Sequence, residues 1–132
     1  MQIVLDLDTI CSDNLLINKT ENIYMKLITK EIERKCAGNL KKPEDKRKPY
    51  LKLFNAYGNG TWLISEILDD GRLYGLCDLG LGFPELGYVS LAEIESAKFA
   101  GAQMIERDRW FTPEKTLSEY ARVANEAGSI QA

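Results

Sequence analysis

The stretch Thr61-Trp-Leu-Ile-Ser-Glu-Ile-Leu-Asp-Asp-Gly-Arg-Leu-Tyr-Gly-Leu-Cys77 decides the fold. It predicts two strands, Thr61 to Leu68 and Arg72 to Cys77, because apolar residues in this part of the chain recur with a period of about two. Asp70-Gly71 between two such segments is a signal for a two-residue hairpin with a type I′ turn. We therefore expect an antiparallel hairpin here.

Further strand candidates lie on both sides of this hairpin. Tyr50 to Phe54 precedes it and leads into a turn at Tyr57-Gly-Asn-Gly60. Leu86 to Val89 predicts a short fourth strand, and Ile105 to Phe111 is a candidate for a last one. Because these strands follow one another in a run, the pattern predicts an antiparallel meander and not a parallel α/β sheet.

Three helices accompany the predicted strands. Apolar spacing predicts the first from Thr29 to Cys36, ended near Gly38. Ser90-Leu-Ala-Glu93 is a capping box for a second helix to about Phe99. The closing helix runs through Asn125 and is capped by Thr112-Pro113 or by Thr116-Leu-Ser-Glu119.

The predicted fold class is α+β: an antiparallel β-meander of four to five strands packed with an N-terminal, a middle and a C-terminal helix. At 132 residues the chain has room for one core. We expect residues 1–24 to form an N-terminal extension, 25–126 a single α+β domain and 127–132 a flexible tail. The predicted core comprises Leu27, Ile32, Leu53, Trp62, Ile64, Leu73, Leu76, Leu86, Val89, Leu91, Ile94, Leu117 and Tyr120.

Composition restricts the chemistry that this chain can perform. It contains no histidine, which is the usual general base and metal ligand near neutral pH. Its three cysteines have no Cys-x-x-Cys spacing, so neither a disulfide framework nor a cysteine zinc site is expected. We therefore expect a non-enzymatic protein without metal or cofactor. No export signal or membrane span is recognisable, which predicts a cytoplasmic protein that does not contact membranes.

Two enzyme hypotheses remain as alternatives, both resting on carboxylates. Ile3-Val-Leu-Asp-Leu-Asp-Thr9 resembles the nucleophile motif of haloacid-dehalogenase-like phosphatases, which implies Asp6 as nucleophile and Asp8 as general acid and base. That motif belongs at the end of a central parallel strand, whereas a meander is predicted here. The other alternative is a magnesium- or manganese-dependent hydrolase. Its ligands would be four acids near predicted strand ends: Asp78, Glu85, Glu106 and Asp108.

Nucleic acid is the alternative partner. Lys41 to Lys48, of sequence KKPEDKRK, predicts an exposed basic loop in which Lys46, Arg47 and Lys48 would contact phosphates. Tyr50, Tyr57 and Trp62 would then be the stacking platforms. Two acids interrupt the run, and the formal net charge of the whole chain is −3.

One long segment, Gly75 to Glu95, resembles a bacterial family known only as a domain of unknown function. Its most specific part is Pro84-Glu-Leu-Gly-Tyr-Val-Ser-Leu91, and the resemblance covers about Met25 to Arg122. It implies that Met25 is the usual start of such proteins. It also implies a setting on plasmids and integrated mobile elements, beside genes for single-strand binding, antirestriction or partition proteins.

From these observations we predict an accessory or interaction protein of a mobile element that acts against host defence by binding a protein partner. Carboxylates offer the same sign of charge as DNA phosphates to a partner's lysines and arginines. The oligomeric state is left open. The predicted binding residues are Asp78, Glu85, Tyr88, Glu93, Glu95, Glu106 and Asp108.

Overall fold

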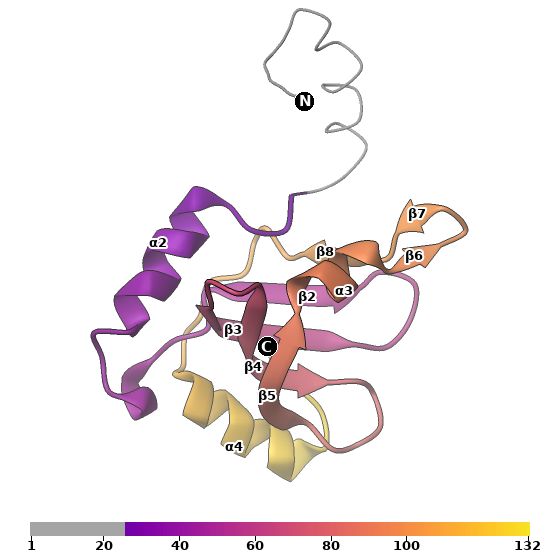
Figure 1. The fold of residues 1–132 in the computed structure, drawn as a ribbon. Coiled ribbons are helices and arrows are strands. Elements are labelled where there is room, and N and C mark those ends of the chain that lie inside the picture. Colours follow the sequence, from indigo (N-terminus) through magenta and orange to yellow (C-terminus); the bar gives the residue numbers. More distant parts are fainter. Residues whose placement is uncertain (1–25) are drawn as a thin grey trace, which may run out of the picture.

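The computed structural model of this protein describes residues 26–132 (Figure 1). A five-stranded antiparallel sheet with the order β5-β4-β3-β2-β8 forms its centre. This confirms the predicted α+β fold with a meander, since β2 to β5 are neighbours in chain order. The strands are β2 (Leu51–Asn55), β3 (Thr61–Ile67), β4 (Arg72–Asp78), β5 (Glu85–Ser90) and β8 (Ile105–Arg107).

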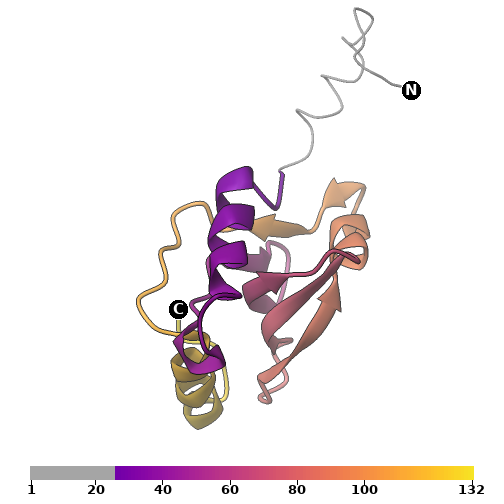
Figure 2. The same cartoon turned by 60° about the vertical axis from the view of Figure 1, so that its left-hand side comes forward.

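Two apolar cores lie on opposite faces of the sheet, because successive strand residues point to opposite sides. Trp62 and Ile64 belong to the first core, and Leu63 between them belongs to the second. Three helices complete the cores: α2 (Lys30–Asn39) and α3 (Leu91–Ser96) reach the first, and α4 (Leu117–Ala127) covers the second. Figure 2 shows α3 and α4 on opposite sides of the sheet.

Local signals place the helix ends. Thr29 caps α2 by accepting a hydrogen bond from the Ile32 N–H at 3.1 Å. Thr116 and Glu119 form a reciprocal capping box at the start of α4, and Gly128 ends that helix in a left-handed conformation with φ of 83°. The capping box at α4 therefore stands where the sequence predicted one, whereas the cap at Thr29 was not predicted.

The β3–β4 turn differs from the predicted type I′ turn. That turn needs positive φ at both central residues. Gly71 has φ of +91°, whereas Asp70 is absent from the described non-glycine residues with positive φ. Leu68 N–H donates to Arg72 O and Gly71 N–H donates to Leu68 O, so three residues span the turn. The type I′ prediction is wrong because Asp69 joins the turn, leaving Gly71 as the left-handed residue that closes it.

Two element boundaries are also corrected. The middle helix ends at Ser96 and not at Phe99, since Ala97 is extended and Lys98–Phe99 (β6) pairs with Ala102–Gln103 (β7). The last strand stops at Arg107, four residues before the predicted end at Phe111. A short 3-10 turn, η2 (Glu44–Lys46), lies in the predicted basic loop.

The predicted core is largely confirmed. Ile32, Val89 and Leu91 pack against the first core while only partly buried. The prediction that Leu86 belongs to the core is wrong, since this residue is 46% exposed. The reason is that β5 is an outer strand of the sheet and α4 packs on β4. The division of the chain at residues 24 and 126 stays a prediction.

Candidate functional site

The loop between β4 and β5 displays large apolar side chains to solvent. Leu79, Leu81 and Phe83 are 57%, 73% and 78% exposed. Gly80 and Gly82 alternate with them and have φ of 82° and 89°, a backbone conformation that favours glycine. A Cβ atom on Gly80 would also lie 2.5 Å from the Asn59 Cβ. The backbone of this loop is therefore specified by its glycines, although its side chains face water.

Asp78 anchors this loop from below. The residue is only 6% exposed, and its Oδ1 accepts a hydrogen bond from the Gly80 N–H at 2.9 Å. Its Oδ2 accepts another from the Ile130 N–H, also at 2.9 Å. Both carboxylate oxygens thus hold backbone groups, one in the loop and one after α4. Asp78 positions the surface and does not itself reach a ligand.

Strand β5 forms one edge of the sheet, and alternate backbone amides face outward from it. Leu91 N–H donates to Gly71 O. Because amide groups alternate along an antiparallel strand, those of Val89 and Gly87 turn toward β4, and those of Leu86 and Tyr88 face the outer edge. Within residues 26–132 no strand pairs with that edge. An unpaired row of amides is a template for another strand.

Leu86 and Tyr88 flank the outer edge on one face of the sheet. Tyr88 is 56% exposed, and its ring centroid lies 4.9 Å from that of Tyr74. The guanidinium carbon of Arg72 sits 4.7 Å from the Tyr88 ring centroid, a cation–π contact. These neighbours contact Tyr88 while leaving about half of it exposed to solvent.

A shallow hollow of about 380 Å³ lies on the other face of β5. Its lining includes Trp62, Val89 and Ile94, together with Leu79 from the exposed loop and Glu93 from α3. The hollow runs from Val89 on β5 across this face to Asn55 on β2 and Ile105 on β8. Apolar surface is thus available on both faces of β5.

The predicted acidic set is split by the fold. Glu85 on β5 and Glu93 and Glu95 on α3 are exposed near the β5 edge. Glu106 lies on β8, and Asp108 just after it, at the opposite edge of the sheet. The sequence did not reveal this separation, because β8 pairs with β2 through residues 50 to 54 positions apart.

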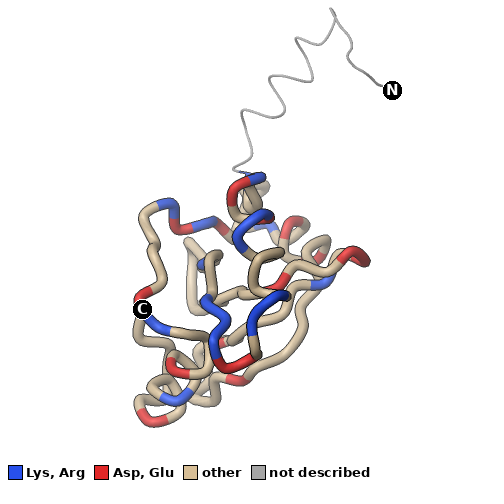
Figure 3. Tube along the Cα trace, turned by 90° about the vertical axis from the view of Figure 1, so that its left-hand side faces the viewer, with Lys and Arg blue, Asp and Glu red and all other residues tan. Residues whose placement is uncertain are grey.

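The three residues predicted to contact phosphates differ in how strongly other parts of the protein already hold them. Lys46 is exposed. Arg47 forms an ion pair with Glu66 at 2.9 Å, and its carbonyl accepts the Leu117 N–H, so it ties the loop to β3 and α4. Lys48 is bound through its backbone to the Asn39 side chain. Figure 3 shows that Lys and Arg gather along α2 and this loop.

The structure also revises the prediction for the three aromatic residues that were expected to stack on bases. Trp62 is 8% exposed and belongs to the first core, so it is no surface platform. Tyr57 is 51% exposed and stacks on Phe99 with ring centroids 4.8 Å apart. Tyr50 is half-buried beside Lys35, whose Nζ lies 5.8 Å from the ring centroid.

The structure does not gather the carboxylates of the hydrolase hypothesis. Across residues 26–132 there is no group of three Cys, Asp or Glu residues that could hold a metal ion. Asp6 and Asp8 lie outside the described residues. Burial raises the pKa of Cys36 to about 12 and that of Cys77 to about 11, so neither thiol is an activated nucleophile.

Comparison with known proteins identifies the family. The profile of a protein of unknown function, DUF2958, matches residues 20–131. The chain belongs to the DUF2958 family. Within residues 26–132 of this DUF2958 protein, the match covers the β-meander and the helices α2, α3 and α4. No curated protein and no solved structure is significantly similar to it.

Sequence reasoning missed the most distinctive part of the DUF2958 surface. Leu79, Leu81 and Phe83 alternate with glycines between two predicted strands, and none of the three was among the predicted binding residues. The signal was present, because three large apolar residues in a glycine-punctuated loop have no helix or strand to bury them. None of the described helices is both long and apolar enough to cross a membrane.

Proposed function

We propose that this DUF2958 protein is a non-enzymatic binding module that captures an extended segment of a protein partner along the outer edge of β5. The observation that carries the proposal is the outer edge of β5, with which no strand of the described part of the chain pairs and which has exposed apolar side chains beside it. An extended peptide adds a strand to such an edge through main-chain hydrogen bonds, while its alternate side chains enter neighbouring apolar sites.

The two faces of β5 offer those sites to alternate partner residues. One face presents Leu86 and Tyr88, and the other opens into the hollow lined by Leu79, Val89 and Ile94. Residues of an added strand point to the two faces in turn, so an apolar residue at every position of a short core would be accommodated. Leu81 and Phe83 extend the apolar area beyond the end of the strand.

The negative charge around this edge favours a partner segment with basic residues on either side. Glu85, Glu93 and Glu95 are exposed there. An apolar segment flanked by Lys or Arg would complement them and would associate faster at low salt. We include Tyr88 and the positioning residue Asp78 in the proposed surface, and we leave out Glu106 and Asp108.

The biological setting in this proposal rests on the sequence resemblance. It is that of a cytoplasmic accessory protein of a plasmid or integrated mobile element. The partner would be a host defence protein whose basic, DNA-binding surface is blocked by the acidic edge. Carboxylates compete with phosphates for the same cationic side chains.

A pair of substitutions at one position separates edge pairing from side-chain contact. Leu86→Pro removes an outward N–H, which an edge strand tolerates, whereas Leu86→Ala removes only the side chain. Peptides selected by phage display on the full chain provide the probe, with affinities measured by fluorescence anisotropy. We expect binding to fall further in Leu86→Pro than in Leu86→Ala, and also to fall in the double variant Leu81→Ser, Phe83→Ser.

Leu40→Ser is the matched control, because Leu40 is 63% exposed but follows α2, away from β5. Its affinity should equal that of the wild type. Circular dichroism confirms that each variant is folded. The proposal is rejected if no extended peptide is selected, or if the affinity of the two Leu86 variants is equal. A concentration-dependent dimer broken by Leu86→Pro would make a second copy of the chain the occupant of this edge.

A further inference from the structure

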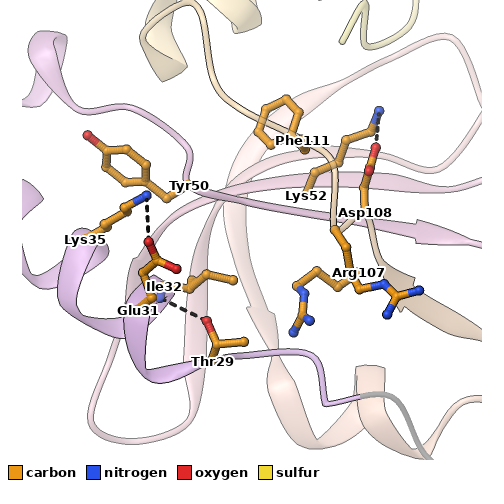
Figure 4. A pocket seen from close by; sticks show the side chains of 10 residues that line it. Thr29, Glu31, Ile32, Lys35, Tyr50, Lys52, Arg107, Asp108 and Phe111 are labelled. Atoms are coloured by element: carbon orange, nitrogen blue, oxygen red, sulfur yellow. Dashed lines mark hydrogen bonds and ion pairs between the residues drawn. The ribbon is translucent and has the colours of Figure 1, made fainter.

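A second surface lies beyond β8, at the edge of the sheet opposite to β5. It is a pocket of about 300 Å³ between the first turns of α2, the beginning of β2 and residues 107–111 (Figure 4). Figure 4 shows Lys35 and Tyr50 on one side of it and Lys52, Phe111 and Arg107 on the other. Arg109 is also part of its lining. The proposed function uses none of these residues.

The pocket concentrates positive charge on a protein whose net charge is −3. Four cationic side chains line it: Lys35, Lys52, Arg107 and Arg109. Two acids accompany them: Asp108 pairs with Lys52 at 3.6 Å, and Glu31 pairs with Lys35 at 3.4 Å. Both partners are at least half exposed, so that pair holds Lys35 only weakly. Four cations against two acids leave this lining with an excess of positive charge, and such an excess raises the local concentration of anions.

Arg107 and Arg109 both line this pocket, and the Arg107 guanidinium also donates a hydrogen bond to the Lys26 carbonyl. Burial and the nearby positive charge of Arg109 both lower the pKa of Arg107. Among the described residues no acid forms an ion pair with Arg109. An anion placed between the two groups would replace this repulsion with attraction. Guanidinium groups suit phosphate oxygens because they donate hydrogen bonds in a planar fork.

An exposed tryptophan follows directly on these arginines. Trp110 is 88% exposed, the largest exposed fraction among the described large apolar residues. Asp108 fixes the turn that presents it, because its Oδ1 accepts the Trp110 N–H at 3.0 Å and its carbonyl accepts the Phe111 N–H. Asp108 is therefore a positioning residue here. The exposed indole offers a flat aromatic face on which an unpaired base can stack.

The surface continues past Trp110 with both signs of charge. A neighbouring hollow of about 330 Å³ shares Lys52, Asp108 and Phe111 with the first and adds Trp110, Lys115 and the acid Glu114. Lys52 Nζ lies 5.7 Å from the Phe111 ring centroid, so cation and aromatic ring alternate along the surface. Aromatic platforms interleaved with cations are the pattern by which proteins hold unstacked bases and track a phosphate backbone.

We infer that this second surface binds single-stranded nucleic acid, with Arg107 and Arg109 contacting phosphates and Trp110 stacking on a base. A single strand fits better than a duplex, because stacking on Trp110 requires an exposed base face. The site differs from the predicted Lys46-Arg47-Lys48 contact, in which Arg47 is already paired with Glu66. It also leaves the β5 edge free.

The test measures binding of the full chain to labelled oligonucleotides about 12 nucleotides long. Fluorescence anisotropy compares single-stranded DNA and RNA with a duplex, a mononucleotide and heparin. Intrinsic fluorescence provides a second readout, since of the two tryptophans Trp62 is buried and Trp110 is exposed. Stacking should quench the Trp110 emission on titration with the strand. Measurements at about 50 mM and about 200 mM salt give the salt dependence.

We expect Trp110→Ala and Arg109→Glu each to weaken single-strand binding at least about tenfold. Arg109→Ala should also reduce the slope of log affinity against log salt by about 0.7, the value for one phosphate contact on a single strand. The matched controls are Arg122→Ala, an exposed arginine on α4, and Phe83→Ala, an exposed aromatic residue at the other edge. Both should bind as the wild type does.

Three results would overturn the inference. The first is no saturable binding to any single strand at low salt. The second is that strand, duplex and heparin bind equally well and that Trp110→Ala does not change their affinity. The surface would then bind any polyanion and would not be specific for single strands. The third is a mononucleotide that binds as tightly as the strand, which would make the ligand a free nucleotide.

Discussion

Replacing Asp78 with alanine tests the central claim about the β4–β5 loop. Its carboxylate accepts two backbone N–H groups at 2.9 Å, from Gly80 and Ile130, in a site that is 6% exposed. Hydrogen bonds to a charged group stabilise by about 1.5–3 kcal/mol each. The Gly80 amide can regain water once its partner is gone, so we take the lower figure for each bond. Asp78→Ala should therefore lower the free energy of unfolding by about 3 kcal/mol.

Asp78→Asn gives an intermediate value that sharpens the test. Its side-chain carbonyl can still accept one N–H, while its NH₂ group faces the other donor. We expect a loss of about 1.5–2 kcal/mol, measured from urea unfolding midpoints at constant slope. Hydrogen exchange should accelerate at Gly80 and Ile130 in both variants. Affinity for the peptides that bind the β5 edge should fall as well, since the loop loses its anchor.

Asp45→Ala is the control for removing one negative charge, because Asp45 is exposed on η2. Its free energy of unfolding should stay within about 0.5 kcal/mol of the wild type. If Asp78→Ala behaved like Asp45→Ala, the two hydrogen bonds would contribute nothing to stability. The positioning role of Asp78 would then be refuted.

Two further predictions concern the interior. Gly75→Ala should destabilise by about 3 kcal/mol in urea unfolding, because its Cβ would lie 1.9 Å from the Leu63 carbonyl oxygen, while Gly87→Ala meets nothing within 4 Å and is the control. Burial raises the pKa of Cys36 to about 12, so the thiol should resist disulfide exchange reagents in the native state until the protein unfolds. Because the native pKa is the higher one, Cys36 stabilises the fold fully below about pH 8.5, and stability should fall as pH rises from there toward about 12.

Local signals in the sequence were sufficient for most elements and insufficient for their arrangement. The capping box at Thr116 and the strands around Asp70-Gly71 depend on neighbouring residues, and both were found. The prediction of a type I′ turn was wrong because Asp69 is part of the turn. Whether it is part of the turn depends on how the two strands pair. The prediction that Leu86 is buried was wrong because its burial depends on how far α4 reaches across the sheet. No local sequence pattern encodes that distance.

The candidate site was predictable only where its residues are close in sequence. Glu85, Tyr88 and Glu93 lie within nine positions of one another and stay on one edge. Glu106 and Asp108 were assigned to the same surface, but the pairing of β8 with β2 carries them to the other edge. The exposure of Trp110 follows from the turn at Asp108 and was not recognised at all.

The sheet order has a consequence for the two proposed surfaces. β5 and β8 are the two edges of a five-stranded sheet, so four strand spacings separate them. At about 4.8 Å per spacing this is roughly 19 Å. Charges that far apart are screened at physiological salt, where the Debye length is about 8 Å. Substitutions more than about 10 Å apart without shared partners are additive.

Leu86→Pro and Trp110→Ala should therefore act independently in the double variant. Leu86→Pro should reduce peptide affinity and leave oligonucleotide affinity unchanged, and Trp110→Ala should do the reverse. The double variant should show both losses, each equal to that of its single variant within about 0.5 kcal/mol. A larger deviation would mean that the two edges communicate through the sheet, and the protein would then couple its partner to nucleic acid instead of binding each separately.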